Sequence, residues 1–300
     1  MVSKSSASLG VLYAVLGVVL FSAKAVLVKL AYQYHIDTVT LLLFRMLFSL
    51  PFYITIALLV KPLKPAEIKK TDYLWIVFFG CIGYHLASYF DFVGLQYIKA
   101  GLERIILFVY PTIVVLLSWL VFRHKISKTQ FRAILIAYFG ILIIFWNEVG
   151  WSGNDALWGG FMVLLSAIAY ASYLVGSGWL LPKFGVLTFT AYAMLVSTAA
   201  VLVHYLFVGN YQLLDYPMEV YILAVVMAIF STLIPSFLVS AAIKQIGAAT
   251  FSVYGSLGPV ATIVLAYFFL DEKISYIQGL GMLVVIYGIV LISIKKKEIN

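Results

Sequence analysis

The stretches IKAGLERIILFVYP (98–111) and IGAATFSVYGSLGP (246–259) decide the fold, because they repeat one pattern at an offset of 148 residues. The same offset aligns further residues without a gap: Lys125-Ile126-Ser127 with Lys273-Ile274-Ser275, Ala133 with Gly281, and Gly140-Ile141 with Gly288-Ile289. Apolar helices resemble one another by chance, but a shared proline, small residues and a polar tripeptide in one register favour a true internal repeat.

The composition places the whole chain in a membrane. Of 300 residues, 64% are hydrophobic and only 11% are charged, with a mean hydropathy of +1.07. A soluble domain carries about 45–50% apolar and about 25% charged residues, so this composition excludes soluble, disordered and disulfide-rich secreted proteins. The single cysteine, Cys81, and four scattered histidines offer no metal-ligand spacing, so we expect no metal and no cofactor.

Apolar runs bounded by charged or turn residues predict an all-α membrane protein with ten transmembrane helices. The runs are continuous and lack the alternation of a barrel strand. They comprise Leu9–Leu30, Thr38–Val60, Tyr73–Phe92, Ala100–Phe122, Phe131–Trp146, Leu157–Leu180, Thr188–Phe207, Val220–Ala241, Ala248–Leu270 and Ile277–Ile294.

The distribution of cations predicts the orientation. With the N-terminus inside, the inner loops and tails hold 14 Lys and Arg residues and the outer loops hold two, Lys99 and Lys273. The positive-inside rule then places both termini in the cytoplasm, and we expect a bacterial inner (plasma) membrane. The start of the chain resembles a signal peptide, but its apolar run continues through Leu30, so we expect an uncleaved first span.

The repeat divides the chain into two five-helix units, residues 1–147 and 148–300. Because five is an odd number, the two units are expected to have opposite orientations in the membrane. Inverted repeats are an architecture of secondary transporters, which bind solute near the midplane and expose it alternately to each side.

Several motifs resemble those of the EamA family of the drug/metabolite transporter superfamily. They comprise Phe21-Ser22-Ala23-Lys24, Lys29, Arg45, Leu107-Phe108-Val109-Tyr110-Pro111, Leu257-Gly258-Pro259 and Leu270-Asp271-Glu272-Lys273-Ile274-Ser275. The family usually has a glutamate after the fourth and ninth spans; Glu272 matches it, whereas His124 stands in its place in the first half. The resemblance implies two five-helix units that move amino acids, other small metabolites or drugs, often outward.

Six charged residues lie inside the predicted spans, all in the first unit: Lys24, Lys29, Arg45, Asp91, Glu103 and Arg104. A charge near a helix centre costs about 2.5–3.5 kcal/mol, so such residues usually face a partner or a wet cavity. One interpretation is a vestibule that binds a polar or zwitterionic solute, with Arg45 and Glu103 as the stronger candidates. The other is structural: Lys24 and Arg104 pair with Asp91 and Glu103, while Lys29 extends to the interface.

Polar and aromatic residues extend the candidate substrate site. Cys81, Tyr84, His85, Ser88 and Asp91 recur at helical steps along the third span. Such stripes either line a site or form hydrogen bonds between helices. Tyr173 and Tyr254 are candidates for stacking on a planar solute. Glu103 and Asp91 are the candidates for proton coupling, with His85 as a less favoured one.

Two prolines are predicted to bend helices, and four small residues are predicted to let helices pack closely. Pro111 and Pro259 should kink the fourth and ninth spans, acting as gates or as static bends. The faces formed by Ala133 and Gly140, and by Gly281 and Gly288, predict close packing of the fifth and tenth helices, within one chain or in a homodimer.

The function predicted from sequence is a secondary transporter for a small polar metabolite, an amino acid or related solute, with export as the favoured direction. No phosphate-binding loop is present, so ATP is not expected to drive it directly, and no nucleic-acid partner is expected. A lipid flippase is the alternative. An intramembrane enzyme is less favoured, because Asp91 and Glu103 form no metal-binding motif.

Overall fold

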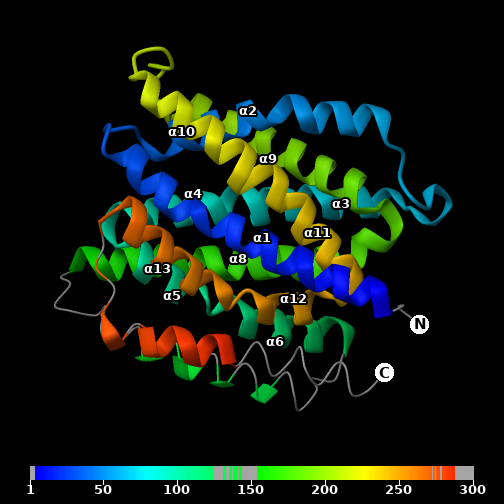
Figure 1. Cartoon of the computed structure of the whole chain (residues 1–300). Helices are drawn as coiled ribbons and strands as arrows, with labels where there is room; N and C mark the ends of the chain where they lie inside the picture. Colours follow the sequence, from blue (N-terminus) through cyan, green and yellow to red (C-terminus); the bar gives the residue numbers. More distant parts are fainter. Residues whose placement is uncertain are drawn as a thin grey trace.

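The computed structural model describes residues 4–123, 131–132, 135–136, 138–140, 142–143, 154–271, 273, 275–277 and 279–287. Every regular element in these residues is a helix, and the helices form one bundle (Figure 1). The all-helical prediction is therefore confirmed for this part of the chain.

Up to residue 123, the elements of the first half are α1 (Lys4–Tyr32), α2 (Thr38–Leu59), the 3-10 turn η1 (Pro65–Glu67), α3 (Lys70–Gly80), the π-helix η2 (Cys81–Leu86), α4 (Ala87–Tyr97), α5 (Ala100–Leu107) and α6 (Tyr110–Phe122). Between residues 154 and 271, those of the second half are α8 (Asn154–Phe184), α9 (Val186–Val208), α10 (Met218–Ala228), the π-helix η3 (Ile229–Leu233), α11 (Ile234–Ile246), α12 (Ala248–Tyr254) and α13 (Leu257–Phe269).

These elements form eight helical segments long and apolar enough to span a membrane. They correspond to eight of the ten predicted spans. The predicted fifth and tenth spans, Phe131–Trp146 and Ile277–Ile294, lie only partly within the described residues, and those of their residues that are described are helical. The helices of the third and eighth predicted spans extend beyond their predicted ends, to Tyr97 and Ile246, because the polar residues that end the apolar runs do not end the helices. The eighth ends only at Gly247, whose φ of +79° a residue with a side chain rarely adopts.

The boundaries of the helices recur at the offset found in the sequence. α2 and α9, α3 and α10, η2 and η3, and α5 and α12 each begin 148 residues apart, as their printed bounds give. The recurrence of the π-helices is the most specific of these matches, because a π-turn inside an α-helix is rare and often marks a functional site. The two halves therefore share a backbone plan, including its irregularities.

The main packing contacts join one half of the chain to the other. α1 packs along α11, α2 along α9, and α4 along α8. Figure 1 shows α1 passing through the middle of the bundle, so the N-terminal helix is central. Glycines permit these close approaches: a Cβ on Gly83 would lie 2.2 Å from Tyr173 of α8.

The α2–α9 pair uses matched threonines at its two ends. Thr40, in the first turn of α2, donates to Asn210 Oδ1 over 3.4 Å, beyond the end of α9. Thr188, its counterpart 148 residues later, donates to the Lys61 carbonyl over 3.2 Å, beyond the end of α2. At each end of the α2–α9 pair, a threonine near the start of one helix thus donates a hydrogen bond to a residue just beyond the end of the other helix.

Candidate substrate site

A cluster of buried charges occupies the first half of the bundle. Lys24 Nζ of α1 lies 2.5 Å from Asp91 Oδ2 of α4, and Arg104 Nε lies 3.2 Å from Glu103 Oε2, both on α5. The side chains of Asp91 and Glu103 are fully buried and interact with each other. The structural interpretation of these charges is therefore present: the Lys24–Asp91 pair joins α1 to α4, whereas the Arg104–Glu103 pair lies within α5.

Two phenylalanine rings hold the cations of this cluster. The Lys24 amine lies 4.8 Å from the ring centre of Phe21 and 6.0 Å from that of Phe92. The Arg104 guanidinium lies 5.9 Å from the Phe21 ring and donates a hydrogen bond of 3.1 Å to the Phe21 carbonyl. Cation–π contacts of this kind strengthen when the cation is buried, and the side chains of Lys24 and Arg104 are both buried.

Arg45 of α2 differs from the other buried cations. Its side chain is 1% exposed, and its guanidinium lies 4.9 Å from the Phe92 ring. Its Nε and Nη2 atoms have no hydrogen-bond acceptor among the described residues, and no carboxylate of that part of the chain lies within ion-pair distance. Asp91 is near enough to interact with it electrostatically, but Asp91 is already paired with Lys24. Arg45 is therefore a desolvated cation without a full counter-ion.

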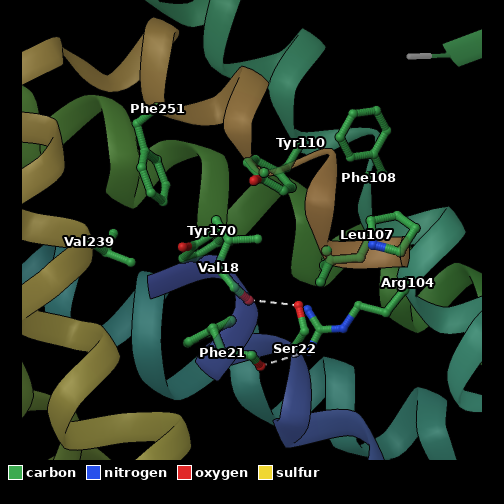
Figure 2. Close-up of a pocket in the computed structure, with 13 residues that line it drawn as sticks. Val18, Phe21, Ser22, Arg104, Leu107, Phe108, Tyr110, Tyr170, Val239 and Phe251 are labelled. Carbon is green, nitrogen blue, oxygen red and sulfur yellow. Dashed lines mark hydrogen bonds between the residues drawn. The ribbon is translucent and has the colours of Figure 1, made fainter. Parts of the chain in front are cut away.

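A cavity of about 30 Å³ adjoins the cluster on the side of Arg104 (Figure 2). This volume holds about two water molecules. Its wall is largely apolar and includes five aromatic rings; it is lined by Val18, Phe21, Ser22, Arg104, Leu107, Phe108, Tyr110, Tyr170, Val239, Phe251, Gly255, Gly258 and Pro259. Phe21 stacks on Tyr170 with ring centres 5.8 Å apart. The cavity thus places one paired cation against a ring-lined space formed by both halves.

The helix breaks form one wall of this cavity. The helix of the fourth predicted span is interrupted between α5 and α6, just before Pro111. The helix of the ninth predicted span is interrupted between α12 and α13, just before Pro259. The predicted irregularities at the two prolines are present, while a gating role stays a prediction. At the second break a Cβ on Gly255 would lie 1.4 Å from the Tyr110 hydroxyl, so only glycine permits this approach of the two breaks.

The other predicted site residues lie apart from this cavity. Tyr173 is buried between Tyr84, with ring centres 4.8 Å apart, and Phe189, at 6.0 Å. His85 contacts His204 of α9, with ring centres 5.2 Å apart. Ser88 and Tyr254 are buried on α4 and at the end of α12, and neither lines the ring-lined cavity. Lys29 lines a separate hollow at the end of α1.

The predicted small-residue face is used within one chain. A Cβ on Gly140 would lie 2.7 Å from the Gly281 carbonyl, so these glycines are in close contact. Ala133 and Gly288 lie outside the described residues. A homodimer through the fifth and tenth helices stays a prediction.

Sequence analysis assigned no site role to three residues that shape the site. Phe92 holds two cations, Tyr110 contacts the second helix break at Gly255, and His204 contacts His85. Aromatic residues form 16% of the chain, so ring content alone could not select Phe92 or Tyr110. The alignment of Pro111 with Pro259 was the usable signal for the meeting of the breaks.

The family model that matches this chain covers nearly all of it. The model for the EamA-like transporter family matches twice, at residues 8–146 and 157–294. The chain belongs to the EamA-like transporter family. This family is part of the drug/metabolite transporter superfamily, as the motifs around Phe21 and Pro111 predicted.

Curated relatives of this EamA-like protein carry the same general description. An uncharacterized transporter of Bacillus subtilis (strain 168), YcbK, is 32% identical over 92% of this chain and 89% of its own length. A second from the same organism, YyaM, is 24% identical over 79% of this chain and 78% of its own length. A solved structure, titled only as the crystal structure of a protein, matches 99% of this chain and all of its own with a TM-score of 0.75. That match, at 15% identity, supports the fold alone.

Family and spans together identify an integral, multi-pass membrane transporter. They point away from an enzyme. The buried charges and the ring-lined cavity are then the features of the described residues on which a substrate proposal can rest.

Proposed function

We propose that this protein is a secondary transporter that moves a small carboxylate-bearing metabolite by alternating access, with an amino acid as the solute class that fits best. The observation that carries the proposal is Arg45. A buried guanidinium with unused donors recognises a carboxylate by paired, charge-assisted hydrogen bonds. Leaving such a cation without a partner is costly, so a site of this kind indicates a ligand that supplies the missing acceptor.

Inverted repeats, the architecture that alternating access needs, are supported by the direction of corresponding helices. Gly10 of α1 and Gly178 of α8 both approach residues 243–248. Further along, Phe21 stacks on Tyr170. Residue numbers therefore rise along α1 while they fall along α8 in the same direction. We propose two inverted five-helix units, residues 1–147 and 148–300, whose relative rocking opens the central site to each side in turn.

The carboxyl groups of Asp91 and Glu103 are the proposed site for an ammonium group or a coupling proton. They lie side by side in a buried place, and two adjacent carboxylates favour a shared proton or a bridging cation. Arg45 and Asp91 are close enough to interact, so a zwitterion can place its two charged groups on the two residues. Coupling to protons remains a proposal that a pH gradient tests.

The small volume of the cavity supports a state that holds no solute. About 30 Å³ is too small for an amino acid, and the threonine contacts tie both ends of the α2–α9 pair. We therefore propose that solute entry needs separation of the halves at the helix breaks, with Pro111 and Pro259 as hinges. Outward transport, cytoplasmic termini and a bacterial inner membrane complete the proposal; they rest on the family resemblance and the loop cations.

Proteoliposomes test this function directly. Purified protein is reconstituted, loaded with each unlabelled standard amino acid in turn, and supplied with the same labelled amino acid outside. We expect saturable counterflow of at least one unmodified amino acid. Absence of counterflow for all of them would contradict the amino-acid proposal; movement of a labelled lipid between leaflets would support a flippase, and a chemically altered product would support an enzyme.

A further inference from the structure

We infer that Lys24 is a built-in substitute for the ammonium group of the solute. Its amine neutralises Asp91 while the carrier is empty, and it gives up that position when an amino acid binds. This inference rests on the proposed function, since it assigns a role within the same site. It also removes Lys24 from the residues expected to contact the solute.

The first observation is the closeness of the Lys24–Asp91 pair. The two groups lie 2.5 Å apart, and both side chains are almost completely buried. A buried carboxylate without a cation is strongly unfavourable, so an empty carrier needs this pair if it is to close around Asp91. Arg45 is a poor replacement, because it is held over the Phe92 ring and is assigned to the solute carboxylate.

The second observation is that the Lys24 amine has other interaction partners close to Asp91: the Phe21 ring and Glu103. The Phe21 ring lies 4.8 Å from it, and Glu103 interacts with it electrostatically. The cation nearest to Glu103 among the described residues is Arg104, at 3.2 Å, and neither Glu103 oxygen accepts a hydrogen bond within that part of the chain. The amine can therefore move from Asp91 toward Glu103 without leaving the buried cluster.

The charge of the site then stays the same through the cycle. Lys24, Arg45 and Arg104 face Asp91 and Glu103, which leaves one unmatched positive charge in the described cluster. A zwitterion adds no net charge when its carboxylate meets Arg45 and its ammonium meets Asp91. An empty carrier with Lys24 on Asp91 can consequently return without a co-transported cation. The inference predicts net transport in the wild type, in addition to exchange.

The test compares two fluxes in the same proteoliposomes. Exchange is the counterflow of the amino acid that gives the largest wild-type signal, and net efflux is its release into medium without amino acid. In Lys24→Met we expect net efflux to fall about a hundredfold, because the empty carrier carries an unpaired Asp91. Exchange should fall by less than about threefold, because the solute supplies the cation in both directions.

Three further measurements distinguish this role from a structural one. Lys24→Arg should restore net efflux, since a cation returns. Ethylammonium in the medium should restore net efflux by Lys24→Ala. Lys29→Met, which removes a lysine of the same helix, should leave the ratio of the two fluxes unchanged.

The possible failures are separable. Parallel loss of both fluxes in Lys24→Met, or an unchanged ratio between them, would overturn the role of Lys24. A wild-type protein that exchanges no amino acid would instead overturn the proposed function.

Discussion

The two halves of the chain share a backbone plan but not a chemistry. Helices and π-turns begin 148 residues apart, yet all the buried charged side chains of the described residues lie in the first half. At the same offset Asp91 is replaced by Val239, and Glu103 by Phe251. The buried polar groups of the described second half are uncharged: most are serine and threonine hydroxyls, with tyrosine hydroxyls such as that of Tyr173 beside them.

The difference indicates that the two halves contribute different kinds of side chain to the site. Val239 and Phe251 line the cavity opposite Arg104, so the second half supplies an apolar wall to the charges of the first. A repeated backbone allows the two halves to move against each other, while a single charged cluster avoids the cost of a second one. The expected effects below test this division, starting with the largest.

The strongest test concerns the ion pair that joins α1 to α4. Asp91→Asn should lower the free energy of unfolding by about 3–5 kcal/mol, because it removes the one carboxylate among the described residues within ion-pair distance of the buried Lys24 amine. The double variant Lys24→Met/Asp91→Asn should recover most of this loss. Thermal unfolding of the detergent-purified variants measures both. Additive losses in the double variant would mean that the two residues are not coupled.

The next test compares two buried arginines. Arg45→Gln should reduce exchange about a hundredfold, because the solute carboxylate loses its charged donor. Its stability should be unchanged or higher, since an uncompensated charge is removed.

Arg104→Gln is the matched control, because Arg104 is paired with Glu103 and bonded to the Phe21 carbonyl. We expect that variant to lose about 3 kcal/mol of stability. Equal destabilisation by the two substitutions would show that Arg45 has a structural partner rather than a solute.

A smaller effect is expected at the meeting point of the helix breaks. Gly255→Ala should destabilise the protein by about 1–3 kcal/mol, because its new methyl group would overlap the Tyr110 hydroxyl. Adding Tyr110→Phe should recover part of that loss. Gly258→Ala is the control, since a Cβ there would meet Ser22 Oγ at an ordinary 3.6 Å. Thermal unfolding of the three variants and the wild type gives the comparison; equal losses at both glycines would contradict it.

The smallest expected effects concern the matched threonine contacts at the two ends of the α2–α9 pair. Thr40→Val and Thr188→Val should each cost about 0.5–1.5 kcal/mol, the typical contribution of one hydrogen bond. Nearly equal losses in thermal unfolding are expected, in contrast to the unequal centre. A loss confined to one variant would mean that the matched contacts do not contribute alike.

The sequence by itself determined the spans, the repeat and the residues that carry charge. Apolar runs must be long enough to cross a bilayer, so composition and length sufficed for eight segments that the structure describes. The motifs around Phe21 and Pro111 indicated the family. The pairing of Lys24 with Asp91 followed from the high cost of a lone charge in a membrane.

Only the tertiary structure decided which buried groups meet and which are left over. Helical spacing does not predict an ion pair between the neighbours Glu103 and Arg104, whose side chains start about 100° apart. A π-helix changes the face on which the following residues lie. His85 and Asp91, which regular helical spacing places on one stripe, therefore contact different partners, His204 and Lys24. That Arg45 has no carboxylate within ion-pair distance among the described residues depends on the positions of all their acidic groups at once, which a linear pattern does not contain.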